Sequence, residues 1–294
     1  MKRFAFLNGR LIPEALAVVS ILDRSFLYGD GLFETIAVHR GQPFRWNQHL
    51  ERLRQGMAFL RFQLPLTEER LHKSALRLIE VNRLPESILR LTLSRGVGVR
   101  GYSTRGATQP VVAMSLHPGP AARPRSGPRW KLVTASARLP SGDPLARFKT
   151  CNKLTQIMAR LEAEERGADE ALLLDDRGHV AEGASSNFFW VERGGICTPP
   201  LACGVLPGVT RAVVFEICAK LGLRVRERRI SPGRLRGAGA FLSMSSMGVV
   251  AVSMLDGRAL PAVPLVPEIQ KAYRSLMETE CAGWKEVSTR SSRS

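Results

Sequence analysis

The chain has 294 residues, of which 44% are hydrophobic and 23% charged, and this composition excludes disordered, collagen-like and disulfide-scaffold proteins. Its 43 lysines and arginines exceed its 26 aspartates and glutamates, and the resulting net charge of +17 raises nucleic acid, a membrane surface or a small anion as partner. Only eight of the basic residues are lysines. The five cysteines show no metal-ligand spacing, and no signal peptide or long apolar run occurs, so we expect a cytoplasmic protein with no metal and no membrane partner.

The first part of the chain, residues 1–117, predicts an α+β domain. Turn signals at residues 8–9 and 40–41 each separate two short apolar stretches, which is the pattern of a β-hairpin. Leucines recur at helical spacing after Asn47, whereas apolar and polar residues alternate over 89–94 as in a strand with one wet face. The elements expected here are hairpins over 4–12 and 32–44, helices over 47–60 and 67–81, and strands over 89–94 and 111–116.

A linker and a second domain follow. Residues 118–129 are rich in proline and glycine without apolar periodicity, which predicts an interdomain linker. Residues 130–286 are interpreted as the second domain, and the Ser/Arg-rich residues 287–294 as a disordered tail. Asn152 is expected to cap the first helix of this domain. The expected elements are strands at 131–137, 171–174, 180–191, 241–243 and 249–255, and helices at 152–166, 209–221 and 267–281.

Residues 204–211, GVLPGVTR, form a glycine-containing loop that leads into a helix. The amides of Val209 and Thr210 would face an anion at the positive end of the helix dipole. An ordinary loop-to-helix junction is the alternative. The loop matches neither the GxxxxGK(S/T) nor the GxGxxG phosphate motif, so nucleotide binding is not favoured.

Two further residues stand out by their surroundings. Lys149 lies among apolar and small residues just before a helix, and Glu182 lies in a stretch of glycine, serine and alanine. A partly desolvated lysine amine can form an imine and later move a proton. Taken singly, each is more often a solvated surface residue. Together with the anion site, however, they supply what pyridoxal phosphate needs, namely an imine partner, a counter-ion for the ring nitrogen and a phosphate site.

Five segments, in order along the chain, resemble class IV (fold type IV) pyridoxal-phosphate enzymes, the family of branched-chain aminotransferases, D-amino-acid transaminases and aminodeoxychorismate lyases. They are the segments at 28–35, 49–53, 148–152, 181–187 and 206–211. The resemblance covers about residues 5–276 and implies a two-domain α/β (α+β) fold, with a small N-terminal domain and a larger, β-barrel-like, cofactor-binding C-terminal domain. It also implies a homodimer with the site between the two domains.

The resemblance assigns roles to individual residues. Lys149 corresponds to the catalytic lysine that forms the imine with pyridoxal 5′-phosphate, and Glu182 to the glutamate that holds the pyridine nitrogen. The cofactor phosphate is expected to bind at the start of the predicted helix and to nearby polar side chains. The residues expected there are Arg52, Val209, Thr210 and Ser245.

Three features favour the lyase subfamily. Residues 94–103, SRGVGVRGYS, resemble the SRGxGxRGYS stretch of aminodeoxychorismate lyases, and residues 245–250 resemble their NSLMGI segment, with Met244 in place of the asparagine. Thr35 lies where these lyases carry a threonine near the reacting carbons and where branched-chain transaminases usually have glycine. On the same resemblance Arg100 meets a substrate carboxylate, the alternative being a solvated loop arginine. The expected substrate-binding residues are Tyr28, Phe33, Arg100 and Tyr102.

The leading hypothesis is a 4-amino-4-deoxychorismate lyase that releases 4-aminobenzoate and pyruvate for folate synthesis, with Lys149 as base and acid in turn and Thr35 as a proton relay. The alternative within the family is a transaminase of branched-chain or D-amino acids that uses 2-oxoglutarate. A non-enzymatic nucleic-acid-binding protein is a distant alternative, because the arginines are scattered and only three tyrosines are available for stacking. We therefore expect no nucleic-acid partner.

Overall fold

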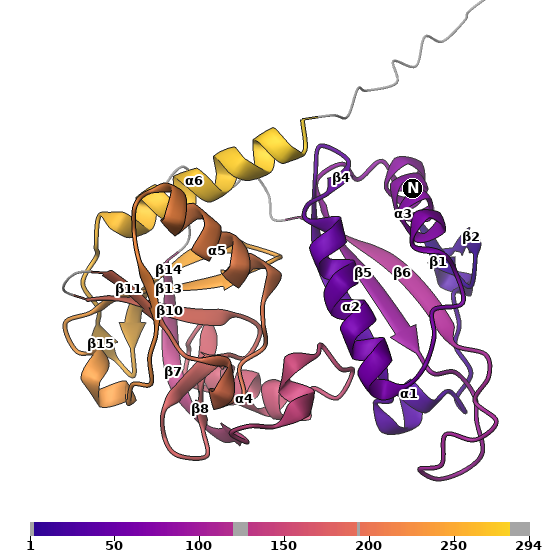
Figure 1. The fold of residues 1–294 in the computed structure, drawn as a ribbon, viewed down its shortest axis with the longest axis horizontal. Coiled ribbons are helices and arrows are strands. Elements are labelled where there is room, and N and C mark those ends of the chain that lie inside the picture. The colour runs from indigo at the N-terminus through magenta and orange to yellow at the C-terminus, as the bar shows by residue number, and fades with distance from the viewer. Residues whose placement is uncertain (1–2, 120–128, 193–194, 283–294) are drawn as a thin grey trace, which may run out of the picture.

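In the computed structural model, residues 3–119, 129–192 and 195–282 are described, and they form two bodies that are each built around a β-sheet (Figure 1). The N-terminal body is a six-stranded antiparallel sheet in the order β2-β1-β6-β5-β3-β4. Its strands are β1 (Phe4–Leu7), β2 (Arg10–Pro13), β3 (Gly31–His39), β4 (Gln42–Pro43), β5 (Ser87–Ser94) and β6 (Val111–Pro118). Its helices are α1 (Arg24–Tyr28), α2 (Trp46–Leu60) and α3 (Glu68–Asn82).

The two faces of the N-terminal sheet differ. Buried leucines of β5 pack in one cluster with Leu50 of α2 and Leu78 of α3, so these helices cover one face. Because successive strand residues point to opposite faces, Arg90 between those leucines lies on the other face, where it is paired in register with Thr35 of β3. Phe33 shares that face with Thr35. The solvent-exposed face predicted for β5 is therefore the face of the sheet that carries Phe33, Thr35 and Arg90.

The C-terminal body is a closed barrel. Its strands follow the order β10-β13-β14-β7-β8-β9, and the pairing of Asn187 in β10 with Glu182 in β9 closes the ring. Pairing is parallel between β14 and β7 and between β7 and β8, and antiparallel elsewhere in the ring. The barrel strands are β7 (Arg129–Leu139), β8 (Glu170–Asp175), β9 (Val180–Gly183), β10 (Asn187–Glu192), β13 (Gly239–Met244) and β14 (Gly248–Leu255).

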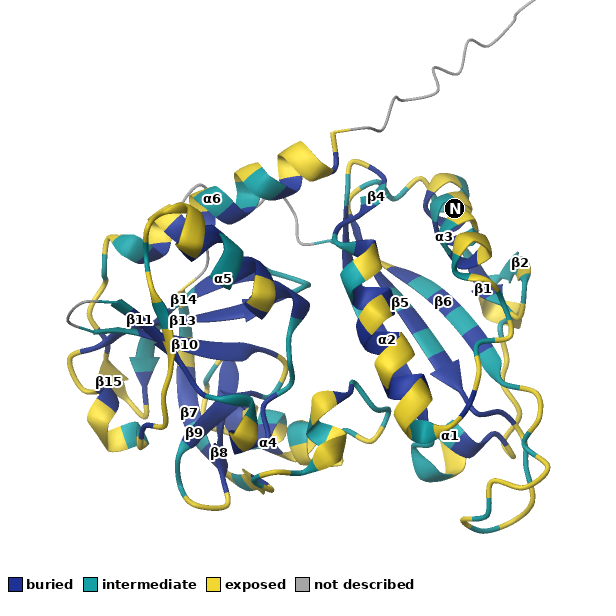
Figure 2. Ribbon diagram, in the orientation of Figure 1, coloured by how far each residue is buried: buried dark blue, intermediate teal, exposed yellow. Residues whose placement is uncertain are grey.

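Three helices pack on the outside of the barrel, where Figure 2 shows them with exposed outer sides over buried strands. Phe189 and Phe241 stack at 4.8 Å and belong to the cluster that joins the sheet to α5 and α6, whereas Ala159 and Ala163 of α4 pack against β7 and β8. The helices are α4 (Leu154–Glu165), α5 (Val209–Lys220) and α6 (Leu265–Glu280). The remaining strands are β11 (Gly195–Thr198), β12 (Val225–Glu227) and β15 (Arg258–Ala259).

The predicted α+β fold with a barrel in its C-terminal part is confirmed, and so are both predicted hairpins. Two local predictions are wrong. Asn152 does not cap α4, because Lys153 is the N-cap and Asn152 packs instead against Gly29. The strand expected over 180–191 is two strands, because a turn in which the Gly183 amide donates to the Ser186 carbonyl separates β9 from β10.

The domain bounds stay a prediction. Residues 120–128 of the expected linker and all of the expected tail lie outside the described residues. Residues 148–151 cross the proposed division, because Phe148 belongs to the N-terminal core cluster and Thr150 pairs with Leu32 of β3. This crossing segment carries Lys149.

Candidate active site

A cavity of about 640 Å³ is lined by residues of both bodies. From the N-terminal body it receives Tyr28, Phe33, Thr35, Arg52 and Arg90. From the C-terminal part of the chain it receives Lys149, Lys153, Glu182, Val209, Thr210 and Ser245. Every site residue predicted from the sequence therefore lines one cavity, except Arg100 and Tyr102.

Lys149 lies on an extended segment that pairs with an edge of β3. The Phe33 amide donates to the Lys149 carbonyl at 2.8 Å, and the Cys151 amide donates to the Gly31 carbonyl at 2.9 Å. The Lys149 Nζ lies 4.7 Å from the centroid of the Phe33 ring. Burial, reinforced by the charge of Arg52, lowers the pKa of Lys149 from 10.5 to about 8. An appreciable part of this amine is thus uncharged near neutral pH, as a nucleophile or a base must be.

Arg52 is held rigidly at the side of the cavity by Glu34. Its Nε and Nη2 donate to the two carboxylate oxygens of Glu34 at 2.8 and 2.6 Å, and the ring of His49 contacts the same carboxylate at 2.7 Å. Burial alone would raise the pKa of Glu34, but Arg52 and His49 outweigh it and lower that pKa to about 2. Arg52 Nη1 donates to the Pro207 carbonyl at 3.1 Å, which brings the guanidinium to the loop before α5. Glu34 and His49 lie within the family-like segments, but sequence reasoning gave them no role.

Glu182 lies in a closed hydrogen-bond arrangement in β9. The Leu206 amide and the Asn187 Nδ2 donate to its Oε2 at 3.0 and 3.1 Å, and the same Nδ2 donates to the Leu206 carbonyl at 2.9 Å. Burial raises the pKa of Glu182 to about 7. Among the described residues none donates to Oε1, so this oxygen can accept a hydrogen bond from a bound cation.

The N-terminus of α5 faces the cavity without a side-chain cap. Gly208 is its N-cap, and Val209 and Thr210 begin the helix, so their amides carry the positive end of the dipole. The hydroxyls of Thr210 and Ser245 lie 3.5 Å apart beside these amides. A Cβ at Gly208 would lie 2.0 Å from Asn187 Oδ1, so the close approach of this loop to β10 requires glycine. With Arg52 next to Pro207, these groups can hold a phosphate.

Arg90 is the site residue that sequence reasoning missed. Its guanidinium lies 3.9 Å from the centroid of the Phe33 ring, and its Nε donates to Thr92 Oγ1 at 3.2 Å. Burial lowers its pKa, and no carboxylate among the described residues opposes this shift. The signal was present as the one basic residue in the leucine alternation of β5, but it was interpreted as part of a solvent face.

Arg100 and Tyr102 do not line the cavity. Both are exposed, and Tyr102 keeps 89% of its surface accessible. The Tyr102 ring meets the Tyr28 ring edge-on at 5.7 Å, and Tyr28 does line the cavity. The loop that carries both residues is thus next to the cavity through Tyr28, and their predicted role in substrate binding stays a prediction.

Residues 31–255 match the family Amino-transferase class IV. The chain belongs to the class IV aminotransferase family. This confirms the family predicted from the five motifs, and with it that the chain is an enzyme of this family.

The relatives include both transaminases and lyases. The chain is 34% identical to a putative branched-chain-amino-acid aminotransferase of Methanocaldococcus jannaschii over 87% of its length and 88% of that protein. It is 30% identical to the aminodeoxychorismate lyase of Bacillus subtilis, covering 76% of each chain. Among solved structures, a T.th. branched-chain amino acid aminotransferase with pyridoxamine 5′-phosphate is similar at a TM-score of 0.89 and 28% identity, covering 97% of this chain and 98% of that one.

Neither a metal cluster nor a membrane span occurs in the described part of the chain. It holds no group of three or more histidine, cysteine or acidic side chains placed to bind a metal. None of its helices is long and apolar enough to cross a membrane.

Proposed function

We propose that this class IV enzyme is a 4-amino-4-deoxychorismate lyase, which releases 4-aminobenzoate and pyruvate and so serves folate synthesis. The observation that supports the proposal is that Thr35 lines the same cavity as Lys149, Glu182 and the N-terminus of α5. The lyase-like segment at 94–103 supports the lyase over its relatives.

The cofactor is pyridoxal 5′-phosphate, and the residues of the cavity fit it. The close approach at Gly208, where a Cβ would fill the space, leaves the first amides of α5 open to a phosphate. Arg52 and the hydroxyls of Thr210 and Ser245 supply further donors. Glu182, whose pKa is about 7, would be ionised by a protonated ring nitrogen. When bound, the cofactor accepts the electrons released at the substrate carbon that bears the amine.

The chain's own groups then move the protons. Lys149 Nζ, with a pKa of about 8, takes the proton from the substrate carbon that bears the amine and later returns one. Thr35 relays a proton to the oxygen that leaves with pyruvate. Arg90, on the same face as Thr35, binds a substrate carboxylate. Loss of the ring proton and departure of pyruvate make the ring aromatic, which drives the reaction.

The test is a product assay on purified enzyme loaded with pyridoxal 5′-phosphate. We expect 4-amino-4-deoxychorismate to yield pyruvate and 4-aminobenzoate in equal amounts. Thr35→Val, which keeps the shape and removes the hydroxyl, should lower the rate about 100-fold, whereas Thr35→Ser should retain it within about threefold. Absence of both products from active holoenzyme would refute the lyase.

A transaminase is the second candidate. The 34% identity to the putative branched-chain-amino-acid aminotransferase favours it, and Arg90 would bind the second carboxylate of 2-oxoglutarate equally well. Glutamate formed from 2-oxoglutarate and a panel of branched-chain and D-amino acids, with no 4-aminobenzoate from the lyase assay, would establish this function instead.

We also propose that the enzyme is a cytoplasmic homodimer. Exposed apolar side chains lie in two segments, residues 16–26 and helix α4. The two segments come close where Asn152, just before α4, packs against Gly29, just after α1, and both of these residues line the cavity. The exposed side chains are Leu16, Val18, Ile21, Leu22, Phe26, Leu154, Ile157, Met158 and Leu161. A monomer rarely leaves so many large apolar side chains in water, so a second copy of the chain is the expected occupant. The five unpaired cysteines agree with a reducing compartment.

A further inference from the structure

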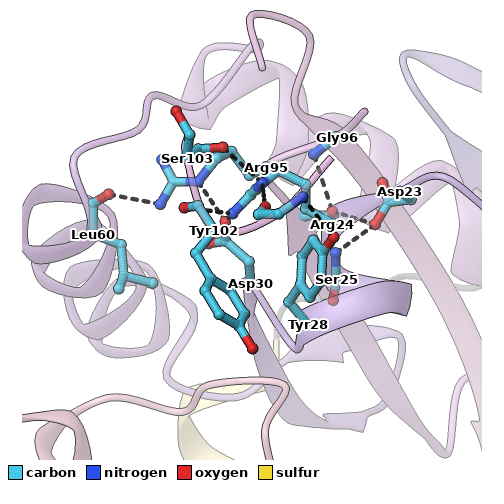
Figure 3. A network of polar contacts seen from close by, with 12 residues as sticks. Asp23, Arg24, Ser25, Tyr28, Asp30, Leu60, Arg95, Gly96, Tyr102 and Ser103 are labelled. Carbon is cyan, nitrogen blue, oxygen red and sulfur yellow. Dashed lines mark hydrogen bonds and ion pairs between the residues drawn. The ribbon is translucent and has the colours of Figure 1, made fainter. Parts of the chain in front are cut away.

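Two buried arginines share one carboxylate at the edge of the cavity (Figure 3). Arg24 Nε and Arg95 Nε donate to the same oxygen of Asp30, at 2.8 and 2.7 Å. Only 3% of Arg24 and 6% of Arg95 is exposed, and together the two guanidiniums hold the pKa of Asp30 below its usual value although burial opposes them. A single carboxylate leaves most of the N–H groups of two guanidiniums to be satisfied elsewhere.

The two arginines direct those remaining donors to different elements. Arg95 donates to the carbonyls of Leu60 and Arg61 at the end of α2, at 2.8 and 3.5 Å. Arg24 instead donates to three consecutive carbonyls, those of Gly101, Tyr102 and Ser103, which belong to the loop over residues 97–104, named here the 97–104 loop. Those three bonds measure 3.0, 3.3 and 2.9 Å.

Further contacts join this loop to the wall of the cavity. The Gly101 amide donates to the Tyr28 hydroxyl at 3.0 Å, the Arg24 guanidinium lies 5.1 Å from the centre of the Tyr28 ring, and Tyr102 meets that ring edge-on. Tyr28 and Asp30 both line the cavity. Movement of the loop away from Arg24 would leave buried charged donors without partners, which is costly, so Arg24 locks the loop and Tyr28 in one arrangement.

We propose that Arg24 is a positioning residue that holds the 97–104 loop and Tyr28 in the conformation that the substrate meets. The proposal rests on the proposed function only in that the substrate enters this cavity. Arg24 itself does not line the cavity and acts through Tyr28 and the loop. Arg95 is its natural comparison, because it is equally buried and binds the same carboxylate but does not reach the loop.

The experiment compares Arg24→Lys with Arg95→Lys in the holoenzyme. A lysine can still pair with Asp30, but it cannot bridge three carbonyls. For Arg24→Lys we expect hydrogen exchange in the 97–104 loop to be about tenfold faster, KM to rise about tenfold and kcat to stay within about threefold, as for the loss of one or two charge-assisted hydrogen bonds. For Arg95→Lys we expect faster exchange at 60–62 and a KM within about threefold of the wild type.

Three results would overturn the proposal. The first is hydrogen exchange of the 97–104 loop in Arg24→Lys that is as slow as in the wild type. The second is faster exchange of the loop in Arg24→Lys with an unchanged KM. The third is a rise of KM in Arg95→Lys equal to that in Arg24→Lys. If Arg24→Lys does not fold, Tyr28→Phe removes the acceptor of the Gly101 amide, and it must then speed exchange at Gly101; unchanged exchange there would overturn the proposal. If the wild type turns over neither candidate substrate, the proposed function fails, and the exchange data alone decide whether Arg24 holds the loop.

Discussion

At the scale of single residues, the chemistry of the cavity follows from a balance of charges around Lys149. Burial is the largest effect and lowers the pKa of Lys149 to about 8. Arg52 and Lys153 lower this pKa further, while Glu34 and Glu182 raise it. In the same space, Glu34 binds the Arg52 guanidinium through both carboxylate oxygens. The lowered pKa thus favours a reactive amine at Lys149, and the Glu34 contacts fix the guanidinium of Arg52 beside it.

Replacement of Lys149 by methionine should abolish activity without loss of the fold. We expect a fall in rate of about 1000-fold or more, because the amine both bonds to the cofactor and moves protons. The folded-state pKa of about 8 lies below the unfolded value of 10.5, so the lysine costs the wild-type apoenzyme stability as pH falls through this window. At pH 7, Lys149→Met should therefore raise the free energy of unfolding measured with urea by about 3 kcal/mol, with a smaller gain at pH 10.5.

The matched control is Lys73→Met, because Lys73 is exposed on α3 and pairs only with Glu69 at the surface. It should change neither activity nor the pH dependence of unfolding between pH 7 and 10.5, because its partner Glu69 titrates only at acid pH. A Lys149→Met protein that fails to fold while wild-type apoenzyme is stable would contradict the catalytic assignment.

Gly208→Ala should weaken cofactor binding. The added Cβ would lie 2.0 Å from Asn187 Oδ1, so the loop must shift and carry the first amides of α5 away from the phosphate. We expect about a tenfold or greater rise in the Kd for pyridoxal 5′-phosphate, measured by titration of the apoenzyme, and a loss of about 1–3 kcal/mol of stability. Gly233→Ala is the control, because a Cβ there meets nothing within 4 Å. Equal Kd values for both variants would argue against a phosphate at α5.

At the scale of elements, the starts of α3 and α5 differ in whether a side chain caps their first backbone amides. The start of α3 is closed by the Thr67 hydroxyl, which accepts from the Arg70 amide at 3.2 Å. The start of α5 carries Gly208 and no side-chain cap, and it faces the cavity. At the start of α5 the first backbone amides are free beside an arginine and can bind an anion. At the start of α3 the side-chain cap already pairs one of these amides, so that start serves only the stability of the helix.

Thr67→Ala tests whether the cap of α3 contributes to stability but not to activity. Loss of the cap should lower the free energy of unfolding by about 1 kcal/mol and leave kcat and KM unchanged, since α3 packs on the face of the sheet away from the cavity. Urea denaturation and the product assay measure the two effects, with Thr67→Ser as the variant that restores the bond. A change in KM with Thr67→Ala would show that α3 is linked to the site.

Elements with a strong local pattern could be predicted from the sequence, and elements defined by distant partners could not. The hairpins followed from their glycine turns, and α2, α3 and α5 from apolar periodicity and capping signals. Three-residue β12 was missed, since it is a strand only because it pairs with β11. The break at 184–186 was missed for the same reason: β9 and β10 are separate strands because they pair with each other to close the barrel.

At the scale of the whole molecule, the cavity exists because Lys149 and its neighbours leave the barrel and pair with the N-terminal sheet. Phe148 packs in the N-terminal core, and Arg45 at the start of α2 pairs with Glu216 of α5 and Glu280 of α6. These contacts tie the two bodies together. The exposed apolar side chains of α1 and α4 are the surface that the proposed second copy would cover.

Ile157→Glu should convert the proposed dimer to a monomer. Ile157 is 52% exposed on α4, and a carboxylate there would be buried without a partner in the dimer, which should weaken association by about 100-fold or more. Sedimentation at several protein concentrations measures this, with Lys73→Met on α3 as a control because it changes the net charge by the same one unit. A wild-type protein that sediments as a monomer at all concentrations would refute the proposed dimer.

The sequence by itself determined the family, and it also marked Lys149, Glu182 and the helix start proposed for the phosphate, because each carries a short local pattern. Only the tertiary structure showed that Arg90 faces the cavity, that Glu34 holds Arg52 and that Arg24 binds the 97–104 loop. Alternation along a strand indicates that two faces differ, but not which of them meets water. That is decided by what packs on each face, and here one is covered by helices and the other borders the site.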